Sequence, residues 1–231
     1  MMKYYYDLMS QPSRACYIFL KKNKIPFTPC PLRITKGEHR SEEYTKINPF
    51  QLVPAIEHNG FNLTESVAIL RYLCREFPHV GEEWYPSDSK IQARIDEYME
   101  WQHLNTRMQL AMYFQTKFII PKMTGTEPDM KTVERSQDRM ETILDQFEEI
   151  WLDNRPYVAG DKITVADIVA ICELEQPSMA GYDVTEGRPK LAEYMKRVKK
   201  HLQPEYDEAF EQVYRVRGRF WGGENAPHSK L

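Results

Sequence analysis

The spacing of apolar residues changes near residue 80, and this change limits the fold more than any other feature of the chain. Over residues 3–77, short strand-like runs alternate with helix-like runs. Pro, Gly and acidic residues interrupt the pattern over residues 78–89, which predicts a linker. Beyond it almost every run has helical spacing. We therefore expect an α/β domain at residues 1–78 and an all-helical domain at residues 89–231.

The α/β part carries signals for a compact sheet with helices packed on it. The expected elements are a strand at 3–6, a helix at 12–24, a weak strand at 27–33, a hairpin of 55–57 with 61–63, and a helix at 66–77. Asn59-Gly60 at the centre of the hairpin favours a tight turn, because both residues adopt positive φ readily. Pro12 suits the first turn of a helix, where its missing N–H costs nothing.

In the helical part, the run Val165–Leu174 is apolar on nearly every side. This predicts a helix buried at the centre of its domain. Thr164 can cap the helix, and Asp167 stands at the third helical position, where its side chain can reach back to the cap. Ile163 and Ile168 flank these residues as a hydrophobic staple.

Two further helix faces can be assigned from residue spacing. One is expected to be buried, because apolar residues recur along it at helical intervals. Its members are Val133, Met140, Ile143, Leu144, Phe147, Ile150 and Trp151. The other, a basic face of Arg215, Arg217 and Arg219, is expected to be solvated.

The composition excludes several classes of protein. Lys and Arg number 31 and Asp and Glu number 34, so no basic excess points to nucleic acid. No run approaches the roughly 20 apolar residues that span a bilayer, and the first residues lack the apolar core of a secretory signal. The cysteines are scattered without a C-x-x-C pair, which predicts no metal or redox site and fits a reducing cytosol. They are Cys16, Cys30, Cys74 and Cys172.

Two short segments predict a binding site for a small extended peptide with an anionic end. Pro54 heads a strand-like run, where a residue without an N–H is tolerated. A cis bond after Val53 would leave the Val53 N–H and C=O exposed, like one side of a β-ladder. Glu65-Ser66 opens a helical run, and a helix N-terminus offers free N–H groups to a carboxylate. Capping preferences alone also explain Glu65-Ser66, but Val53-Pro54 upstream favours the ligand site.

Taken in order, these segments resemble the glutathione transferases. Val53-Pro54 is similar to the family's cis-proline loop, Glu65-Ser66 to its γ-glutamyl-binding pair, and residues 163–167 to the cap of its central helix. Residues 7–15 are similar to the theta class, in which a serine after the first strand activates glutathione. Further theta-like segments are residues 36–39, 84–86, 96–103 and 186–190. Each motif alone is weak, but their order and spacing together are specific.

The resemblance implies a thioredoxin-like, glutathione-binding domain followed by a helical domain that carries the electrophile site. It implies a cytosolic homodimer that binds no metal, nucleic acid or membrane and detoxifies small electrophiles such as alkyl halides and activated esters. The thiolate of glutathione, the co-substrate, would attack them, and peroxide reduction would be a second activity. The main alternative is a non-catalytic binding or structural protein of the same fold. A thiol–disulfide oxidoreductase would need a cysteine where Ser10 stands.

The resemblance also assigns roles to single residues. Ser10, at the mouth of the first helix, is expected to donate a hydrogen bond to the glutathione sulfur. Ser66 and the helix N–H groups would hold the γ-glutamyl carboxylate, and Glu65 its ammonium group. The backbone at Val53-Pro54 would pair with the cysteinyl unit in strand fashion. His39 would meet the glycine carboxylate.

One position departs from the theta pattern. Theta enzymes often place a lysine just before Val-Pro, and here that position holds Leu52. A lost charge-assisted hydrogen bond costs about 1.5–3 kcal/mol, so the affinity for glutathione would fall about tenfold or more. Gln51 could compensate through neutral hydrogen bonds, whereas Arg40, next to His39, is expected to be solvated.

Two residues compete with Ser10 for the catalytic role. Ser13 lies three positions further on and reads as a first-turn residue. Tyr6 ends the first strand, where other glutathione transferase classes carry a catalytic tyrosine. However, the run of tyrosines at residues 4–6 reads more simply as packing on a strand.

The electrophile pocket is expected on the helical domain, along the helix that faces the cleft in theta enzymes. The resemblance places Trp101, Asn105, Arg107, Met108 and Tyr113 there. Arg107 could stabilise a thiolate or an anionic leaving group, or it could simply form an ion pair. Phe220-Trp221, near the end of the chain, could cap the site.

Overall fold

The computed structural model describes residues 1–220, and the side chains of residues 1–218. Within these residues a four-stranded mixed sheet has the order β2-β1-β3-β4. β1 (Met2–Tyr6) lies between β2 (Phe27–Pro31), which runs parallel to it, and β3 (Ala55–His58), which runs antiparallel. β4 (Phe61–Thr64) pairs antiparallel with β3 and forms the other edge.

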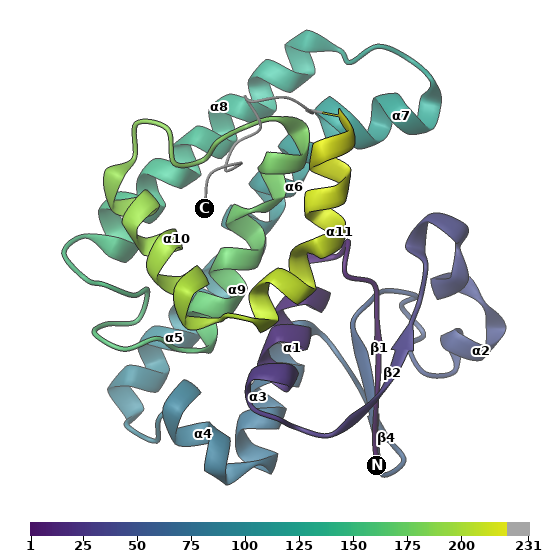
Figure 1. Cartoon of the computed structure of the whole chain (residues 1–231), viewed down its shortest axis with the longest axis vertical. Coiled ribbons are helices and arrows are strands. Elements are labelled where there is room, and N and C mark those ends of the chain that lie inside the picture. The colour runs from purple at the N-terminus through teal and green to yellow at the C-terminus, as the bar shows by residue number, and fades with distance from the viewer. Residues whose placement is uncertain (221–231) are drawn as a thin grey trace.

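Helices cover the sheet on both sides. Along β1 the buried Tyr4 follows the exposed Lys3, as expected of a strand with one buried face. α1 (Gln11–Lys22) and α3 (Ser66–Glu76) lie between the sheet and the helical part of the molecule (Figure 1). The short helix α2 (Glu42–Thr45) lies on the opposite side of the sheet (Figure 1).

The helical part is built around α9 (Val165–Leu174), which α1, α5, α6 and α10 contact. The other helices are α4 (Pro78–Trp84), α5 (Ser89–Trp101), α6 (Met108–Phe114), α7 (Ile120–Thr124), α8 (Met130–Gln146), α10 (Pro189–His201) and α11 (Glu205–Phe220). Short 3-10 helices span Ile34–Lys36, Glu38–Arg40 and Gln176–Ala180, and π-helical turns span His103–Arg107, Gln115–Ile119 and Phe147–Leu152. An α/β part followed by an all-helical part confirms the predicted fold.

The start of α9 forms as its sequence predicts. Every residue of α9 is buried, as are the staple residues Ile163 and Ile168. The carboxylate of Asp167 accepts hydrogen bonds from the N–H of Thr164 at 2.7 Å and from its hydroxyl at 3.1 Å. Asp167 also accepts from the N–H of Val158 at 2.9 Å and the hydroxyl of Tyr194 at 3.1 Å. One buried carboxylate therefore fixes the start of the central helix and the chain that leads into it.

The segment predicted as a linker, residues 78–89, contains α4. Pro78 occupies an early helical position, where proline starts helices as readily as it breaks them. Val80 and Trp84 are buried, and the indole N–H of Trp84 donates to the side chain of Asn23 at 2.7 Å. The boundaries at 78 and 89 stay a prediction.

Two predictions about helix faces are wrong in one residue each. Ile150 is 60% exposed although its neighbours in the predicted face are buried. It lies in the π-helical turn Phe147–Leu152, whose larger number of residues per turn shifts the phase of the face. Arg217 is buried and lies over the ring of Tyr214, whereas Arg215 is exposed as predicted. The side chain of Arg219 lies outside the described residues.

Candidate active site

Ser10 lies on the turn that joins β1 to α1. It is the N-cap of α1, with φ −84° and ψ 125°, and its N–H donates to the carbonyl of Asp7 at 2.9 Å. The side chain is partly exposed and makes no capping hydrogen bond. The Ser10 hydroxyl therefore stands beside the free N–H groups and the positive end of a helix without being used to satisfy them.

Asp7 connects this turn to the segment that carries His39. It is 9% exposed, and its carboxylate accepts from the N–H of Met9 at 2.9 Å and from the N–H of Ile34 at 2.9 Å. Ile34 begins the 3-10 turns that lead to His39. His39 is half-buried, and within the described part of the chain its Nδ1 atom is buried without a hydrogen-bond partner. The exposed Arg40 follows it, as expected.

The loop before β3 presents free backbone groups. The Val53–Pro54 bond is cis, as the sequence suggested. The carbonyl of Leu52 accepts from the Tyr44 hydroxyl and from the Asn48 amide. Among residues 1–220, no backbone hydrogen bond joins the N–H or C=O of Val53 to another residue. These two groups are available to pair with an extended ligand.

The start of α3 lies beside this loop, because Ala55 pairs with Thr64 at the end of β4. Glu65 has φ +65° and ψ 111°, an unusual conformation for a residue other than glycine. Such backbone strain costs about 1–3 kcal/mol and gathers at functional sites. Glu65 is exposed, and Ser66 next to it is 3% exposed. The strained conformation turns the Glu65 side chain outward while Ser66 opens the helix.

Arg107 reaches from the helical part to this helix start. Its Nε donates to Glu173 at 2.9 Å, and the side chain of Glu173 is fully buried. Its Nη2 donates to the Ser66 hydroxyl at 3.3 Å, and its Nη1 lies 3.4 Å from Nδ1 of His103. Burial and the neighbouring guanidinium of Arg107 lower the pKa of His103. Arg107 thus forms the ion pair that was its alternative role, and it also fixes the Ser66 side chain.

Two other residues of the predicted electrophile pocket pack on the helices. Trp101 is half-buried, and its ring lies 6.0 Å from that of Tyr98 and 5.3 Å from that of Trp151. The amide of Asn105 donates to the carbonyl of Trp101 at 2.7 Å. Contacts of this kind are also made by residues that only support the fold, so they do not distinguish a pocket role from a structural one.

Met108 and Tyr113 differ in exposure. Met108 is 41% exposed, directly after Arg107, so it can contact a bound molecule. Tyr113 is fully buried, with its ring 5.5 Å from that of Tyr182 and its hydroxyl accepting from Lys117 at 2.7 Å. The structure therefore places Tyr113 inside the helical part, and its burial favours packing over contact with an electrophile.

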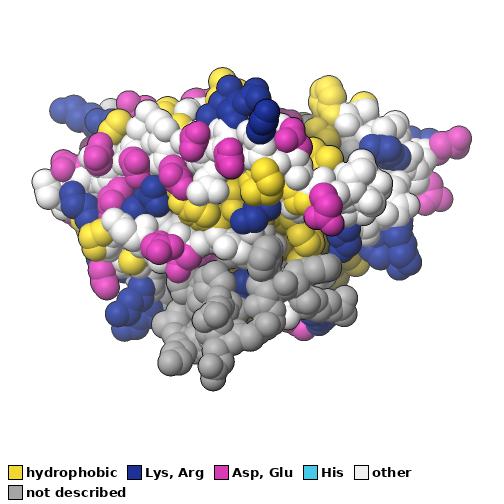
Figure 2. Space-filling model, turned by 90° about the horizontal axis from the view of Figure 1, so that it is seen from above, with side chains coloured by type: hydrophobic (Ala, Val, Ile, Leu, Met, Phe, Trp, Pro, Cys, Tyr) yellow, Lys and Arg dark blue, Asp and Glu magenta, His cyan; other side chains and the backbone are white. Residues whose placement is uncertain are grey.

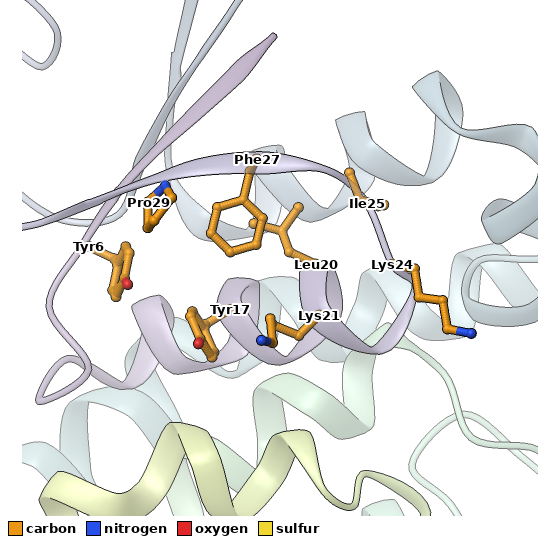
Figure 3. Close-up of a pocket in the computed structure, with 8 residues that line it drawn as sticks. All are labelled: Tyr6, Tyr17, Leu20, Lys21, Lys24, Ile25, Phe27 and Pro29. Atoms are coloured by element: carbon orange, nitrogen blue, oxygen red, sulfur yellow. The ribbon is translucent and has the colours of Figure 1, made fainter.

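The two competitors of Ser10 are both used in packing. Ser13 is fully buried, and its carbonyl accepts from the Tyr4 hydroxyl at 2.6 Å. The ring of Tyr6 stacks on that of Tyr4 at 4.8 Å, and burial raises the pKa of Tyr6. Tyr6 also lines a hollow of about 520 Å³ between α1 and β2, together with Tyr17 and Phe27 (Figure 3). That hollow includes neither Ser10 nor any of the predicted glutathione-binding residues.

The surface carries both signs of charge. On the face seen in Figure 2, acidic and basic side chains are interspersed, with apolar side chains between them. Among residues 1–220, no helix has the length and apolarity to cross a bilayer, and no group of three His, Cys, Asp or Glu side chains could hold a metal ion. The predicted cap at Phe220-Trp221 lies outside the described side chains.

Comparison with known proteins identifies the family. The models of the glutathione S-transferase N-terminal and C-terminal domains match residues 1–75 and 104–201. Theta-1 of Homo sapiens is 40% identical over 214 residues, which cover 92% of this chain and 89% of that protein. Human glutathione-S-transferase T1-1 superposes with a TM-score of 0.89 at 38% identity, covering 94% of this chain and 91% of that one. The chain belongs to the theta class of glutathione S-transferases. Human theta-2, solved with glutathione and an unknown ligand, superposes on this theta-class chain with a TM-score of 0.87 at 37% identity, covering 95% of this chain and 88% of that one.

The family membership confirms the predicted class, and the roles of single residues stay predictions. Sequence analysis missed Asp7 and Arg14, which hold the turn of the theta-class chain that carries Ser10. A signal existed for both. Asp7 follows a strand directly, and Arg14 interrupts an apolar helix face, and a charged side chain at such a position needs a partner in the fold.

Proposed function

We propose that this chain conjugates the thiolate of glutathione to small electrophiles such as alkyl halides and activated esters, with Ser10 as the catalytic residue. One observation carries the proposal: the hydroxyl at the start of α1 is held in place by its backbone and makes no capping hydrogen bond. The chain belongs to a transferase family. The backbone groups of Val53 make no hydrogen bond within the described residues, so they can pair with an extended peptide. Reduction of organic hydroperoxides is proposed as a second activity.

The binding roles follow from the chemistry of the tripeptide. Ser66 and the first N–H groups of α3 would hold the γ-glutamyl carboxylate, and Glu65 would accept from the ammonium group. Val53 would pair with the cysteinyl unit, ahead of Pro54. His39, with a buried ring nitrogen that lacks a partner in the described residues, would meet the glycine end. The structure brings the segments of Ser10 and His39 together through Asp7, which supports their common role.

The Ser10 hydroxyl would act by favouring the thiolate over the thiol. A hydrogen bond to a charged group contributes about 1.5–3 kcal/mol and a helix N-terminus about 0.3–1 kcal/mol. Together they would lower the thiol pKa from about 8.5 by roughly two units and raise the thiolate fraction at pH 7 from about 3% to about 75%. The lower pKa also reduces intrinsic nucleophilicity about eightfold. Most of the acceleration must therefore come from holding the electrophile beside the sulfur.

The electrophile would contact the helical part beside Ser66. Met108, the next residue after Arg107, offers an exposed apolar side chain, and Arg107 brings a cation to the start of α3. The Arg107 guanidinium is already paired with Glu173, so its remaining role is to orient Ser66 and to offset negative charge in the pocket. Trp101 and Asn105, which contact each other, would complete the pocket.

Dimerisation and a detoxifying role in the cytosol are further parts of the proposal. Exposed apolar side chains, among them Phe61 and Leu104 at 50% and 67%, are available to a second copy of the chain. Sedimentation of the purified protein would test the dimer, and a single monomeric species at micromolar concentration would contradict it. The theta-class relatives do not favour the alternative, a non-catalytic protein of this fold.

Retention on glutathione resin combined with a panel of small electrophiles separates the two functions. We expect the protein to bind the resin, to elute with free glutathione, and to form thioether products from alkyl halides or activated esters faster than the uncatalysed reaction. Hydroperoxides added to the panel measure the second activity. Binding without turnover of any electrophile would favour the non-catalytic alternative. Absence of binding would reject the glutathione site itself.

Restoring a cation before Val53 is expected to strengthen glutathione binding. Leu52 is 60% exposed, so a lysine there would be partly screened, and Leu52→Lys should lower the KM for glutathione about three- to tenfold at low salt. The gain should shrink as salt is added, and Leu52→Met should leave KM unchanged. An unchanged KM for Leu52→Lys at low salt would place the glycine carboxylate elsewhere.

A further inference from the structure

Arg14 is a fully buried arginine in the first turns of α1. Its Nη1 donates to the carbonyl of Leu8 at 2.8 Å and to the carbonyl of Met9 at 3.2 Å. These are the two residues directly before Ser10 in the turn from β1. A single guanidinium therefore holds both carbonyls of the backbone that leads to the Ser10 side chain.

The other end of the same guanidinium is held by the helical part. Nη2 donates to the carbonyl of Cys172, in α9, at 3.2 Å and to Oε1 of Gln176 at 2.7 Å. Gln176 is 3% exposed and begins the 3-10 helix that follows α9. The ring of Phe210 on α11 lies 4.7 Å from the guanidinium carbon. Arg14 thus fixes the turn relative to three segments that lie far from it in sequence.

Asp7 holds the same turn through its negatively charged carboxylate. Its carboxylate accepts the N–H of Met9 at 2.9 Å while Arg14 takes the carbonyl of the same residue. Met9 is therefore held by both of its backbone polar groups, and the residue that follows it is Ser10. Since the Ser10 hydroxyl makes no capping bond of its own, its position depends on the backbone of this turn.

We propose that Arg14 is a positioning residue that sets the Ser10 hydroxyl at hydrogen-bond distance from the sulfur of bound glutathione. The inference rests on the proposed function. A hydroxyl fixed in this way spends no free energy on reorganisation when the thiolate forms, and a displacement of about 1 Å can cost about a hundredfold in rate. Lysine cannot replace the arginine, because a single ammonium group lacks the planar fork that reaches acceptors on both sides.

The simpler reading is that Arg14 is only a structural link between the two parts of the molecule. Arg71 on α3 provides a matched comparison. It joins α3 to α5 through Asp96 at 2.7 Å and Glu100 at 3.0 Å, and both of these residues lie outside the Ser10 turn. A general loosening between the two parts should affect Arg14→Lys and Arg71→Lys alike, whereas positioning of Ser10 should affect only Arg14→Lys.

The experiment measures the pKa of glutathione bound to the full-length protein, from its ultraviolet thiolate band, with KM and kcat beside it. We expect Arg14→Lys to raise the thiol pKa by about half a unit to one unit and to lower kcat at neutral pH. The KM for glutathione should change less than about twofold, because Val53, Glu65 and Ser66 are untouched. Arg71→Lys should leave the thiol pKa unchanged.

A double-mutant cycle shows whether Arg14 acts through Ser10. In the Ser10→Ala background, Arg14→Lys should produce no further rise in the thiol pKa. Three outcomes would overturn the proposal. The thiol pKa could rise equally in both backgrounds, it could rise as much in Arg71→Lys, or it could stay unchanged in a folded Arg14→Lys protein. If Ser10→Ala alone leaves the thiol pKa unchanged, the proposed role of Ser10 fails first, and that of Arg14 with it.

Gln176→Met serves if Arg14→Lys does not fold. It removes one acceptor of the guanidinium at nearly constant volume and leaves Arg14 in place. We expect a smaller rise of the thiol pKa in the same direction, again absent in the Ser10→Ala background. A folded Gln176→Met protein with an unchanged thiol pKa would then overturn the proposal.

Discussion

Ser10→Ala is expected to raise the pKa of the thiol of bound glutathione by about one to two units and to lower turnover at pH 7 by up to about threefold. The pKa rises because the thiolate loses a hydrogen bond that contributes about 1.5–3 kcal/mol, at about 1.4 kcal/mol for each unit. The thiolate fraction at pH 7 then falls from about 75% to between about 3% and about 25%. The remaining thiolate is more nucleophilic, which offsets part of the loss.

The pH dependence separates ionisation from other effects of the substitution. Because the raised pKa withholds the thiolate only at lower pH, the deficit of Ser10→Ala should shrink as pH rises past about 8.5. The thiolate band and the pH profile of kcat/KM measure the same shift independently. Retained affinity for glutathione resin would show that the binding site is intact in the variant.

Two substitutions serve as controls for Ser10→Ala. Tyr6→Phe removes the hydroxyl of a tyrosine whose ring stacks on that of Tyr4 and lines the hollow beside α1 (Figure 3). None of the predicted glutathione-binding residues lines that hollow. Ser13→Ala removes a fully buried hydroxyl. Both should leave the thiol pKa unchanged. If Tyr6→Phe raised the pKa and Ser10→Ala did not, the serine mechanism would be rejected in favour of a tyrosine.

Local signals in the sequence were enough to predict most of the fold. Asn59-Gly60 marks its hairpin because both residues have positive φ there, and Thr164 with Asp167 marks the start of α9 through their own hydrogen bonds. Val53-Pro54 and Glu65-Ser66 likewise carry their information within a few residues. These two segments lie side by side because Ala55 pairs with Thr64, and the hairpin turn sets this register.

The errors arose where a contact or a change of helix type overrides the local pattern. Ile150 has a helical position that predicts burial, and the π-helical turn around it rotates it outward. Pro78 reads as a breaker and instead starts α4, because Val80 and Trp84 find apolar partners.

The residues that hold the site in place could not be derived from the sequence, because their contacts depend on how distant segments pack. Arg14 contacts Leu8 and Met9 within its own turn but also Cys172 and Gln176, more than 150 residues away. No spacing rule predicts that pairing, since it depends on how α1 packs against α9. The residues that contact a ligand lie at exposed backbone features with short-range signals, whereas those that hold them in place are defined by packing.

Asp167→Ala is expected to lower the free energy of unfolding by about 3–5 kcal/mol, the largest loss of stability among the substitutions considered. The substitution leaves the N–H groups of Val158 and Thr164 and the Tyr194 hydroxyl without their acceptor in the buried interior. Each such group costs about 1–3 kcal/mol, and part of the sum is recovered because a fully buried carboxyl group is removed. Urea denaturation measures the change, and an unchanged midpoint would show that the cap contributes little.

The sign of the pH effect provides a second test at the same residue. Burial raises the pKa of Asp167 to about 6, despite the hydrogen bonds it accepts. The ordinary value is 3.8, so between about pH 4 and pH 6 the folded protein keeps a proton that the unfolded chain has released. This contribution to stability is complete below pH 3.8 and is lost as pH rises through 6. The difference in unfolding free energy between wild type and Asp167→Asn should therefore be larger at about pH 4.5 than at about pH 7.5, by about 2 kcal/mol. A difference that grows instead toward neutral pH would mean that Asp167 is already ionised in the folded protein at pH 4.5, held so by the groups that donate to it.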